Sequence, residues 1–470
     1  MPIRRCNTRQ TVPSGGPASP RQRSSPPVST PPREIRLNAF AMHTITHQSP
    51  GLWRHPRDRS REFKRLPLWL DLARLLERGL FDGIFLADVL GPYDVFGGDA
   101  RAAIRSGAQL PAHDPMLLVP AMATVTQHLG FGITASLSYE PPYLMARRFS
   151  TLDHLTDGRV GWNIVTGYLD SAARALGLDA QRAHDDRYAY AEEYMDAILA
   201  LWRDSWAPDA VRADAQGYAD PDRVQVITHR SPNLRMQALH LCEPSPQRIP
   251  VLYQAGSSSA GQAFAARHAE CVFVSGPSAS VIAPRVAKLR TALRAAGRDP
   301  AAVKVSALAT AIVADTDAEA RALLDDYRAH VDPEGALVLL SGWTGVDFAG
   351  IGLDDEVRFI ASEAGRSAME NFTRADPSRA WSVREVAAHV GIGGAGPVFA
   401  GSAATVADAM EAFVDATGID GFNLAYAVLP ESFEQVVDLL VPELQARGRY
   451  KTAYTEGTLR EKLLREEVLS

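Results

Sequence analysis

Polar side chains gather where the predicted strands of this chain end, and this pattern is the first indication of chemistry. Four of these ends carry hydroxyl, imidazole or carboxyl groups, and a fifth leads into a serine-rich turn. In a parallel barrel the active site lies at the carboxyl ends of the strands, so we expect these side chains to surround one site. They are Thr44 and His47, Asp88 and Tyr93, Thr134 and Ser136, Thr166 to Tyr168, and Gln254 to Ser259.

The turn from Gly256 to Gly261 opens a predicted helix and could hold a phosphate group. Its backbone N–H groups, its serine hydroxyls and the helix dipole would all favour an anion. A serine at a helix start is more often only a cap, and that alternative stays open. His184 and Tyr188 also open a helix, four residues apart on one face. Taken alone, such a pair more often serves capping and packing than ligand binding.

Several catalytic signatures are absent from the sequence. It contains no Rossmann glycine fingerprint, no phosphate loop, no nucleophile elbow and no paired histidines of a zinc protease. Its three cysteines, Cys6, Cys242 and Cys271, are too widely spaced for a metal site or a disulfide scaffold, which favours a reducing, cytoplasmic location. An enzyme without an evident nucleophile or metal usually takes its reactivity from a cofactor. The residues alone therefore predict an enzyme with a phosphorylated cofactor and no metal.

The elements that must position these residues alternate between helix and strand. In the stretch from Tyr143 to Tyr168, a helix with an apolar face ends at Asp157-Gly158 and a buried strand follows at once. On that strand Gly161 and Asn163 should face a barrel lumen, while the residues between them face helices.

Eight strands of this kind alternate with helices along the chain. The pattern favours a (β/α)8 barrel with insertions after strands 4 and 7, at about residues 204–247 and 331–399. A doubly wound open sheet would show the same alternation. We predict the strands at 35–44, 81–88, 131–137, 160–166, 249–255, 270–274, 303–313 and 420–427.

The composition describes an ordinary globular chain. Its 470 residues are 46% hydrophobic and 22% charged, with a net charge of -6. A large core can be buried, and no general affinity for nucleic acid or a membrane surface is expected. Residues 1–34 are rich in Pro, Ser and Arg and are expected to be a disordered tail. Residues 35–460 should form the barrel, and residues 461–470 a C-terminal tail.

The chain resembles the flavin-dependent monooxygenases of the bacterial luciferase-like superfamily, in the group of nitrilotriacetate, dibenzothiophene-sulfone and long-chain alkane monooxygenases. The matching motifs span about residues 35 to 460, and the alkane enzyme looks most similar. The motifs are Gly51-Leu-Trp-Arg-His-Pro56, Phe81 to Asp88, Tyr143 to Thr166, His184-Asp-Asp-Arg-Tyr188, His240 to Gln247 and Tyr253-Gln-Ala-Gly256.

The resemblance implies a barrel enzyme that receives reduced FMN from a separate NAD(P)H-dependent flavin reductase. Dioxygen would form a flavin C4a-hydroperoxide, which inserts one oxygen atom into an alkane-like, organosulfur or amine-type substrate. A homodimer or homotetramer is also implied, without nucleic acid or membrane partners. Two alternatives stay open, namely a deazaflavin-dependent oxidoreductase on the same barrel and a non-catalytic flavin-binding relative.

The same resemblance assigns roles by motif position. It places His47 near the reactive edge of the flavin, where an imidazole could steady a peroxide. It places Tyr93, Gln109 and Tyr168 in the substrate pocket. The assigned FMN contacts are Asp88, Thr134, His184, Tyr188 and Ser258.

The chain departs from the alkane enzyme at three pocket positions. Thr44 replaces a cysteine, and Tyr168 and Leu339 each replace a histidine. Leu339 is expected in a loop that covers the site. These changes should alter substrate choice more than flavin binding.

Overall fold

The computed structural model describes residues 1–3, 33–256, 258–360, 366–375 and 378–464. Residues 34–470 form one compact unit, and the account below concerns that unit. Nearly all of the expected N-terminal tail lies outside the described residues, as do Ser257 and the last six residues.

Within the described residues, eight parallel strands close into a barrel in the order β10-β9-β4-β3-β2-β1-β13-β11, and β11 pairs back with β10. This closure confirms the predicted (β/α)8 barrel and rules out the open sheet, because an open sheet would leave two unpaired edges. The strands are β1 (Arg36–Met42), β2 (Gly83–Ala87), β3 (Gly130–Ser136), β4 (Val160–Val165), β9 (Val251–Gln254), β10 (Cys271–Val274), β11 (Lys304–Ala314) and β13 (Gly421–Ala425).

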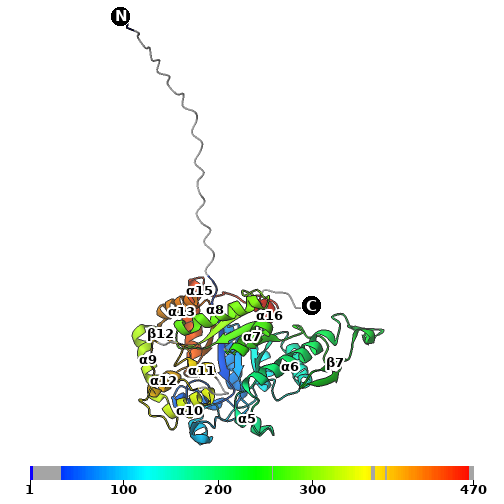
Figure 1. Cartoon of the computed structure of the whole chain (residues 1–470), viewed down its shortest axis with the longest axis horizontal. Coiled ribbons are helices and arrows are strands. Elements are labelled where there is room, and N and C mark those ends of the chain that lie inside the picture. The colour runs from blue at the N-terminus through cyan, green and yellow to red at the C-terminus, as the bar shows by residue number, and fades with distance from the viewer. Residues whose placement is uncertain (4–32, 257, 361–365, 376–377, 465–470) are drawn as a thin grey trace. The chain divides into compact units, whose positions relative to one another are not determined.

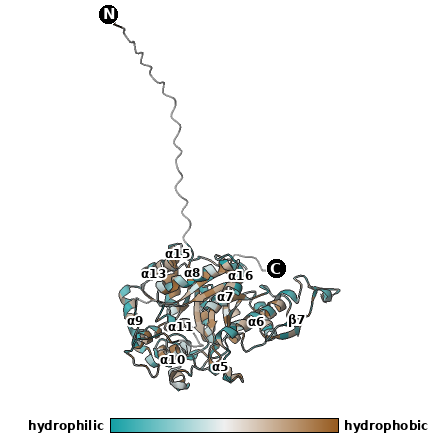
Figure 2. Cartoon of the chain, in the orientation of Figure 1, coloured by the Kyte–Doolittle hydropathy of each residue, from teal (hydrophilic) through white to brown (hydrophobic). Residues whose placement is uncertain are grey.

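Helices surround this barrel and bury their apolar faces against it (Figure 1). Figure 2 shows the hydrophobic residues concentrated at the centre of the unit and hydrophilic residues on the projecting parts. No helix among the described residues has both the length and the apolar character needed to cross a bilayer. The surrounding helices are α1 (Leu66–Arg78), α3 (Val119–Ala123), α4 (Pro142–Leu155), α6 (His184–Asp204), α7 (Ser259–His268), α8 (Ala279–Ala295), α9 (Asp317–His330), α13 (Ala403–Thr417), α14 (Glu431–Gln435), the π-helical turn η6 (Val436–Leu440) and α15 (Val441–Ala446).

The unit of α4 and β4 has the predicted construction. Asp157 and Gly158 both have positive φ, 52° and 75°, and reverse the chain between helix and strand. Gly161 faces the lumen, where an added Cβ would collide with the ring of Tyr253. Asn163 donates a 3.0 Å hydrogen bond to Thr134 across the neighbouring strands. The lumen therefore carries polar groups at this level, and the space left by Gly161 is filled by the ring of Tyr253.

Two insertions interrupt the barrel at the predicted places. The first follows α6 and forms two antiparallel hairpins, β5–β6 (Val211–Asp214, Gly217–Ala219) and β7–β8 (Ile227–Arg230, Arg235–Ala238). The second follows α9 and contains α10 (Pro333–Thr344), α11 (Arg366–Glu370), α12 (Val383–Val390) and β12 (Val398–Ser402), which pairs with the far half of β11.

A second hydrophobic cluster lies over the barrel. It contains residues from three long segments that connect barrel elements. Tyr93 comes from the long connection after β2, Leu169 from the one after β4, and Leu339 from α10. These connections also carry α2 (Arg101–Ser106) and α5 (Asp170–Ala175). The connection between β2 and β3 is long, and the sequence pattern did not predict it as an insertion.

The expected C-terminal tail is wrong for its first residues. Leu459–Leu464 form helix α16, and Leu459, Leu463 and Leu464 are buried in a cluster with Phe85 and other lumen residues. This helix closes the barrel end opposite to the strand carboxyl ends, since Leu459 lies against Gly130, the first residue of β3. A six-residue helix between polar segments gives little sequence signal, because its stability comes from tertiary packing.

Candidate functional site

Five neighbouring strands bring the predicted site residues to one edge of the barrel. The order β1-β2-β3-β4-β9 makes their carboxyl ends consecutive around the rim. His47 follows β1, Thr134 lies in β3, and Tyr168 follows β4. Asp88 directly follows β2, and Ser258 comes four residues after the end of β9. Residues separated by more than 200 positions in the sequence thus lie along one continuous arc.

A cavity at the centre of this arc is lined by Asp88, Thr134, Ser136, Gly167 and Tyr168. Burial raises the pKa of Asp88 to about 7, and the negative charge of Asp114 acts in the same direction. A carboxyl group in this state can donate or accept a hydrogen bond near neutral pH. The cavity therefore combines this carboxyl group and the hydroxyls of Thr134 and Ser136 with apolar neighbours such as Leu169.

Replacing Asp88 with Asn should flatten the pH dependence of stability in the flavin-free protein. The folded-state pKa of about 7 lies above the ordinary value of 3.8. The folded protein then binds more protons than the unfolded chain, so stability is lost as pH rises from about 4 to about 7. The slope from this group is at most about 1.4 kcal/mol per pH unit. Urea unfolding at several pH values should show the loss in the wild type and a smaller one in D88N. An equal dependence of stability on pH in the two proteins would contradict the raised pKa of Asp88.

Tyr93 is the hub of a hydrogen-bond network beside the cavity. Its hydroxyl donates to Gln109 Oε1 at 2.8 Å and lies 2.6 Å from the hydroxyl of Tyr168. Gln109 Nε2 donates to the carbonyl of His47 at 2.9 Å. The indole of Trp343 donates to the Tyr93 hydroxyl at 3.1 Å. The structure thus brings together the residues that were assigned to the substrate pocket.

Burial keeps the two tyrosines of this network protonated. It raises the pKa of Tyr93 well above its ordinary value, and that of Tyr168 to about 12. Both hydroxyls are therefore neutral at physiological pH, and they can orient a substrate without carrying charge.

Trp343 is a hydrogen-bond partner of Tyr93 that the sequence pattern did not predict. It lies one helical turn after Leu339 on α10, so both belong to one stretch of the second insertion. That insertion was read only as an irregular cover, and Leu339 was placed in a loop. The structure corrects this placement, because Leu339 is fully buried within helix α10. The apolar run Ala336 to Leu340 is the sequence feature that could have predicted a buried helix here.

His47 is buried at the end of the arc and is neutral. Burial lowers the pKa of its imidazole to about 3. Gln48 Nε2 lies 3.2 Å from His47 Nε2. An amide nitrogen can only donate, so His47 Nε2 accepts and Nδ1 carries the proton. Nδ1 makes no hydrogen bond of ordinary geometry among the described residues, although a contact with the Phe40 backbone favours the protonated ring. A neutral N–H donor is thus buried just past the end of β1.

Thr44 does not present a free hydroxyl to the site. It donates a 2.7 Å hydrogen bond to the carbonyl of Pro111 and is 1% exposed. The threonine that stands in place of a cysteine therefore anchors the connection after β2.

A second group of polar residues lies where α6 and α7 begin. The rings of His184 and Tyr188 are 5.3 Å apart. Ser258 caps α7 by accepting a hydrogen bond from Gly261 N at 3.1 Å. Added Cβ atoms at Gly256 and Gly261 would each lie 2.7 Å from the Tyr188 hydroxyl, so both glycines are needed for this close approach. Of the predicted turn, Ser257 falls outside the described residues.

This group has the chemistry of a phosphate site. It combines two hydroxyl groups with the backbone N–H groups at the start of α7, a ten-residue helix. The arc thus combines the carboxyl of Asp88 and the hydroxyl of Thr134 with the helix start at Ser258. Asn163 Oδ1 has no hydrogen-bond partner among the described residues, which agrees with a ligand reaching the lumen.

Comparison with known proteins gives a consistent family match. The family model described as luciferase-like monooxygenase matches residues 43–421. Dimethyl-sulfide monooxygenase from Hyphomicrobium sulfonivorans is 45% identical over 92% of this chain and 90% of its own length. Long-chain alkane monooxygenase from Geobacillus thermodenitrificans is 41% identical over 92% of this chain and 94% of its own. The chain is thus more similar to the sulfide enzyme than to the alkane enzyme that its motifs indicated.

Solved structures agree with these sequence matches. The crystal structure of DmoA from Hyphomicrobium sulfonivorans superposes with a TM-score of 0.86 at 44% identity, covering 92% of each chain. A riboflavin lyase, RcaE, crystallised with modified FMN and riboflavin, has a TM-score of 0.86 at 33% identity, covering 93% of this chain and 97% of its own.

Proposed function

Because this chain belongs to the luciferase-like monooxygenase family, we propose that it is the oxygenase of a two-component system that uses reduced FMN and dioxygen. One observation carries this proposal most strongly. It is the strand order, which brings the cavity lined by Asp88 and Thr134 and the start of α7 at Ser258 to the same end of the barrel.

The residues that would hold FMN come from both parts of this arc. Ser258, Tyr188 and His184 would bind the phosphate, and Asp88 and Thr134 the polar edge of the ring system. When bound, reduced FMN supplies the electrons that activate dioxygen, so that one oxygen atom enters the substrate and the other leaves as water. The protein must exclude water from this reaction, and the apolar cluster over the barrel end supports that role.

We further propose a small, largely apolar substrate, with organosulfur compounds favoured over long alkanes. The pocket positions Tyr168 and Leu339 replace two histidines of the alkane enzyme, which removes two titratable groups. The remaining polar groups near Tyr93 are neutral hydroxyl, amide and indole groups. The more similar relative is a dimethyl-sulfide enzyme, and a thioether sulfur is an easily oxidised, weakly polar group.

The reduced flavin would come from a separate NAD(P)H-dependent flavin reductase. The sequence contains no dinucleotide-binding glycine fingerprint, so the proposal needs an outside source of reduced FMN. A protein that borrows reduced flavin should release the oxidised form after turnover. We expect the purified protein to be largely colourless.

A product assay with labelled oxygen tests the function. The chain, FMN, NADH and an unrelated flavin reductase are mixed under ¹⁸O₂ with dimethyl sulfide, a thioether panel and a long alkane. We expect one labelled oxygen atom in the product or in the aldehyde derived from it, and the highest coupling of product to NADH with small sulfides. Peroxide release without labelled product from any substrate would favour the non-catalytic alternative. Reduction of a deazaflavin by an alcohol, without oxygen use, would favour the other alternative.

A further inference from the structure

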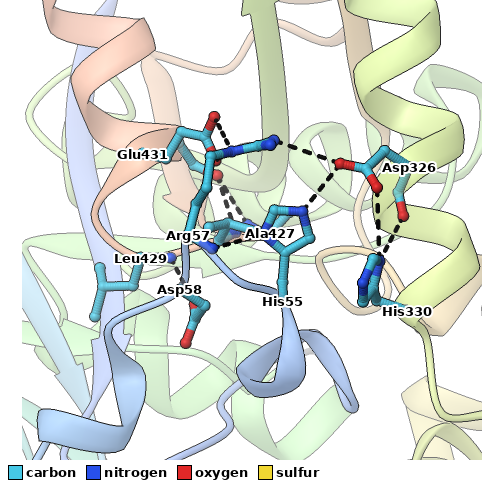
Figure 3. Close-up of polar contacts among 10 residues, drawn as sticks. His55, Arg57, Asp58, Asp326, His330, Ala427, Leu429 and Glu431 are labelled. Atoms are coloured by element: carbon cyan, nitrogen blue, oxygen red, sulfur yellow. Dashed lines mark hydrogen bonds and ion pairs between the residues drawn. The ribbon is translucent and has the colours of Figure 1, made fainter.

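Two histidines and an aspartate form a cluster on the flank of the barrel, away from the arc described above. His55 lies in the segment after β1, and Asp326 and His330 lie one turn apart on α9 (Figure 3). One ligand atom from each residue lies within 4.8 Å of the others. His55 Nε2 is 3.0 Å from Asp326 Oδ2, and His330 Nδ1 is 3.7 Å from Asp326 Oδ1. No other group of this kind occurs in the part of the chain that the structure describes.

We propose that these three residues bind a divalent transition-metal ion of the zinc, cobalt and nickel class. Two imidazoles and one carboxylate are a common ligand set for such ions, and they leave coordination positions for water. Ligand atoms around a tetrahedral zinc ion are roughly 3.3 Å apart, because each bond is about 2.0 Å long. The 3.0 Å between His55 Nε2 and Asp326 Oδ2 already fits this spacing, while the 3.7 Å contact of His330 is made by Nδ1, so side-chain rotation must bring Nε2 of His330 to the ion.

The surroundings orient two of the ligands. His330 Nδ1 donates to the carbonyl of Asp326 at 2.9 Å, which leaves its Nε2 with a lone pair. A backbone carbonyl that fixes the tautomer of a histidine ligand is typical of metal sites. The side chain of His55 is 1% exposed, while those of Asp326 and His330 are 41% and 31% exposed. One ligand is thus held rigidly, and the other two remain open to an ion from solvent.

Two existing hydrogen bonds must change when an ion binds. His55 Nδ1 accepts from the backbone N–H of Arg57 at 3.3 Å, so Nε2 carries the proton and donates to Asp326. Coordination through Nε2 moves that proton to Nδ1, and the long contact from Arg57 is lost. The imidazole remains neutral overall.

The nearest competing charge already has a partner. Arg57 lies 3.4 Å from Asp326 Oδ2, but its Nε lies 2.9 Å from both oxygens of Glu431. Glu431 can retain this arginine when Asp326 turns toward an ion (Figure 3). The cluster is therefore able to exchange one ion pair for metal coordination.

The proposed site would join two segments that flank the pocket. The segment containing His55 follows His47, and α9 leads directly into α10, which carries Trp343. These segments already meet closely, because Asp332 N donates to the carbonyl of Pro50 at 2.9 Å. A bound ion would act as a cross-link between them and would stabilise the folded protein.

Metal titration of the full-length, chelator-treated protein tests the proposal without reference to activity. Zn²⁺ binding is measured by calorimetry, and Co²⁺ binding by its visible absorption bands. We expect one Zn²⁺ per chain, a rise in the melting temperature on binding, and no comparable heat with Mg²⁺, which prefers oxygen ligands. The variants Asp326→Asn and His330→Gln should bind Zn²⁺ at least about tenfold more weakly.

The control is Asp325→Asn, which removes a carboxylate from the same helix turn but outside the cluster. Among the described residues, Asp325 forms an ion pair with the exposed Arg328, and its side chain is 73% exposed. This variant should bind like the wild type. Circular dichroism spectra that match the wild type would exclude unfolding as a cause of lost binding. Unchanged Zn²⁺ affinity in D326N and H330Q, or no binding to the wild type at one equivalent, would overturn the proposal.

Discussion

Exchange of His47 for leucine should lower the rate of oxygenated product formation by about 100-fold or more. Leucine keeps an apolar side chain of similar size in a position that is 2% exposed, but it removes the N–H donor on Nδ1. Binding of reduced FMN, measured by anaerobic fluorescence titration, should change little, because the proposed phosphate contacts at Ser258 and Tyr188 remain. The lost product should appear as hydrogen peroxide in the same assay.

Asparagine at position 47 provides the matched comparison. Its amide can place a hydrogen-bond donor near the position of Nδ1, but it cannot transfer a proton. Partial recovery in H47N would show that the imidazole acts by hydrogen bonding. Because the pKa of His47 is about 3, product formation should not change through this group above about pH 5. If the leucine variant forms product at a rate within twofold of the wild type, His47 does not take part in the reaction.

Replacement of Arg460 by methionine should lower the free energy of unfolding by about 3 to 5 kcal/mol. Arg460 is 1% exposed, and its guanidinium donates to both oxygens of Glu270, at 2.7 and 3.0 Å. It also donates to the carbonyls of Gln247 and Ile249. Methionine would leave the Glu270 carboxylate, which is 12% exposed, without its arginine partner. Urea unfolding monitored by circular dichroism measures the change.

Arg384 is a suitable control for this experiment. Its guanidinium also forms two hydrogen bonds to one carboxylate, that of Asp354, but both side chains are largely exposed. Water solvates both charges there, so R384M should unfold at nearly the same urea concentration as the wild type. Equal destabilisation in the two variants would mean that burial does not determine the importance of the Arg460 pair.

Several parts of the fold could be predicted because their signals are local. The apolar pattern of the sequence predicts helices at residues 259–268 and 317–330, and α7 and α9 have these bounds. The strand before Thr166 has the predicted faces, because a period of two fixes which side chains share a face. The long segments that connect the barrel elements were harder to predict. The segment that contains α2 and Gln109 follows β2, but its short helices have no periodicity long enough to detect.

The candidate site likewise has parts that local sequence patterns predicted and parts that they did not. Strand ends predicted that Asp88, Thr134 and Ser258 would lie on one rim, and the barrel topology brings these residues to one rim. The motif from His240 to Gln247 supported the family resemblance, and the structure gives it a packing role. Its His240 Nε2 lies 3.0 Å from Ser150 Oγ, and Gln247 is hydrogen-bonded to the buried Asp153. Residues in such a motif are therefore not all site residues.

The sequence by itself determined the alternation of elements, the polar strand ends and the family, because each rests on local periodicity or on a long motif. Only the tertiary structure decided that Trp343 reaches Tyr93, that His55 meets Asp326 and His330, and that Arg460 pairs with Glu270. Each of these contacts joins residues between 190 and 275 positions apart. Such contacts depend on how helices and long connecting segments pack around the closed barrel, and no local pattern encodes that packing.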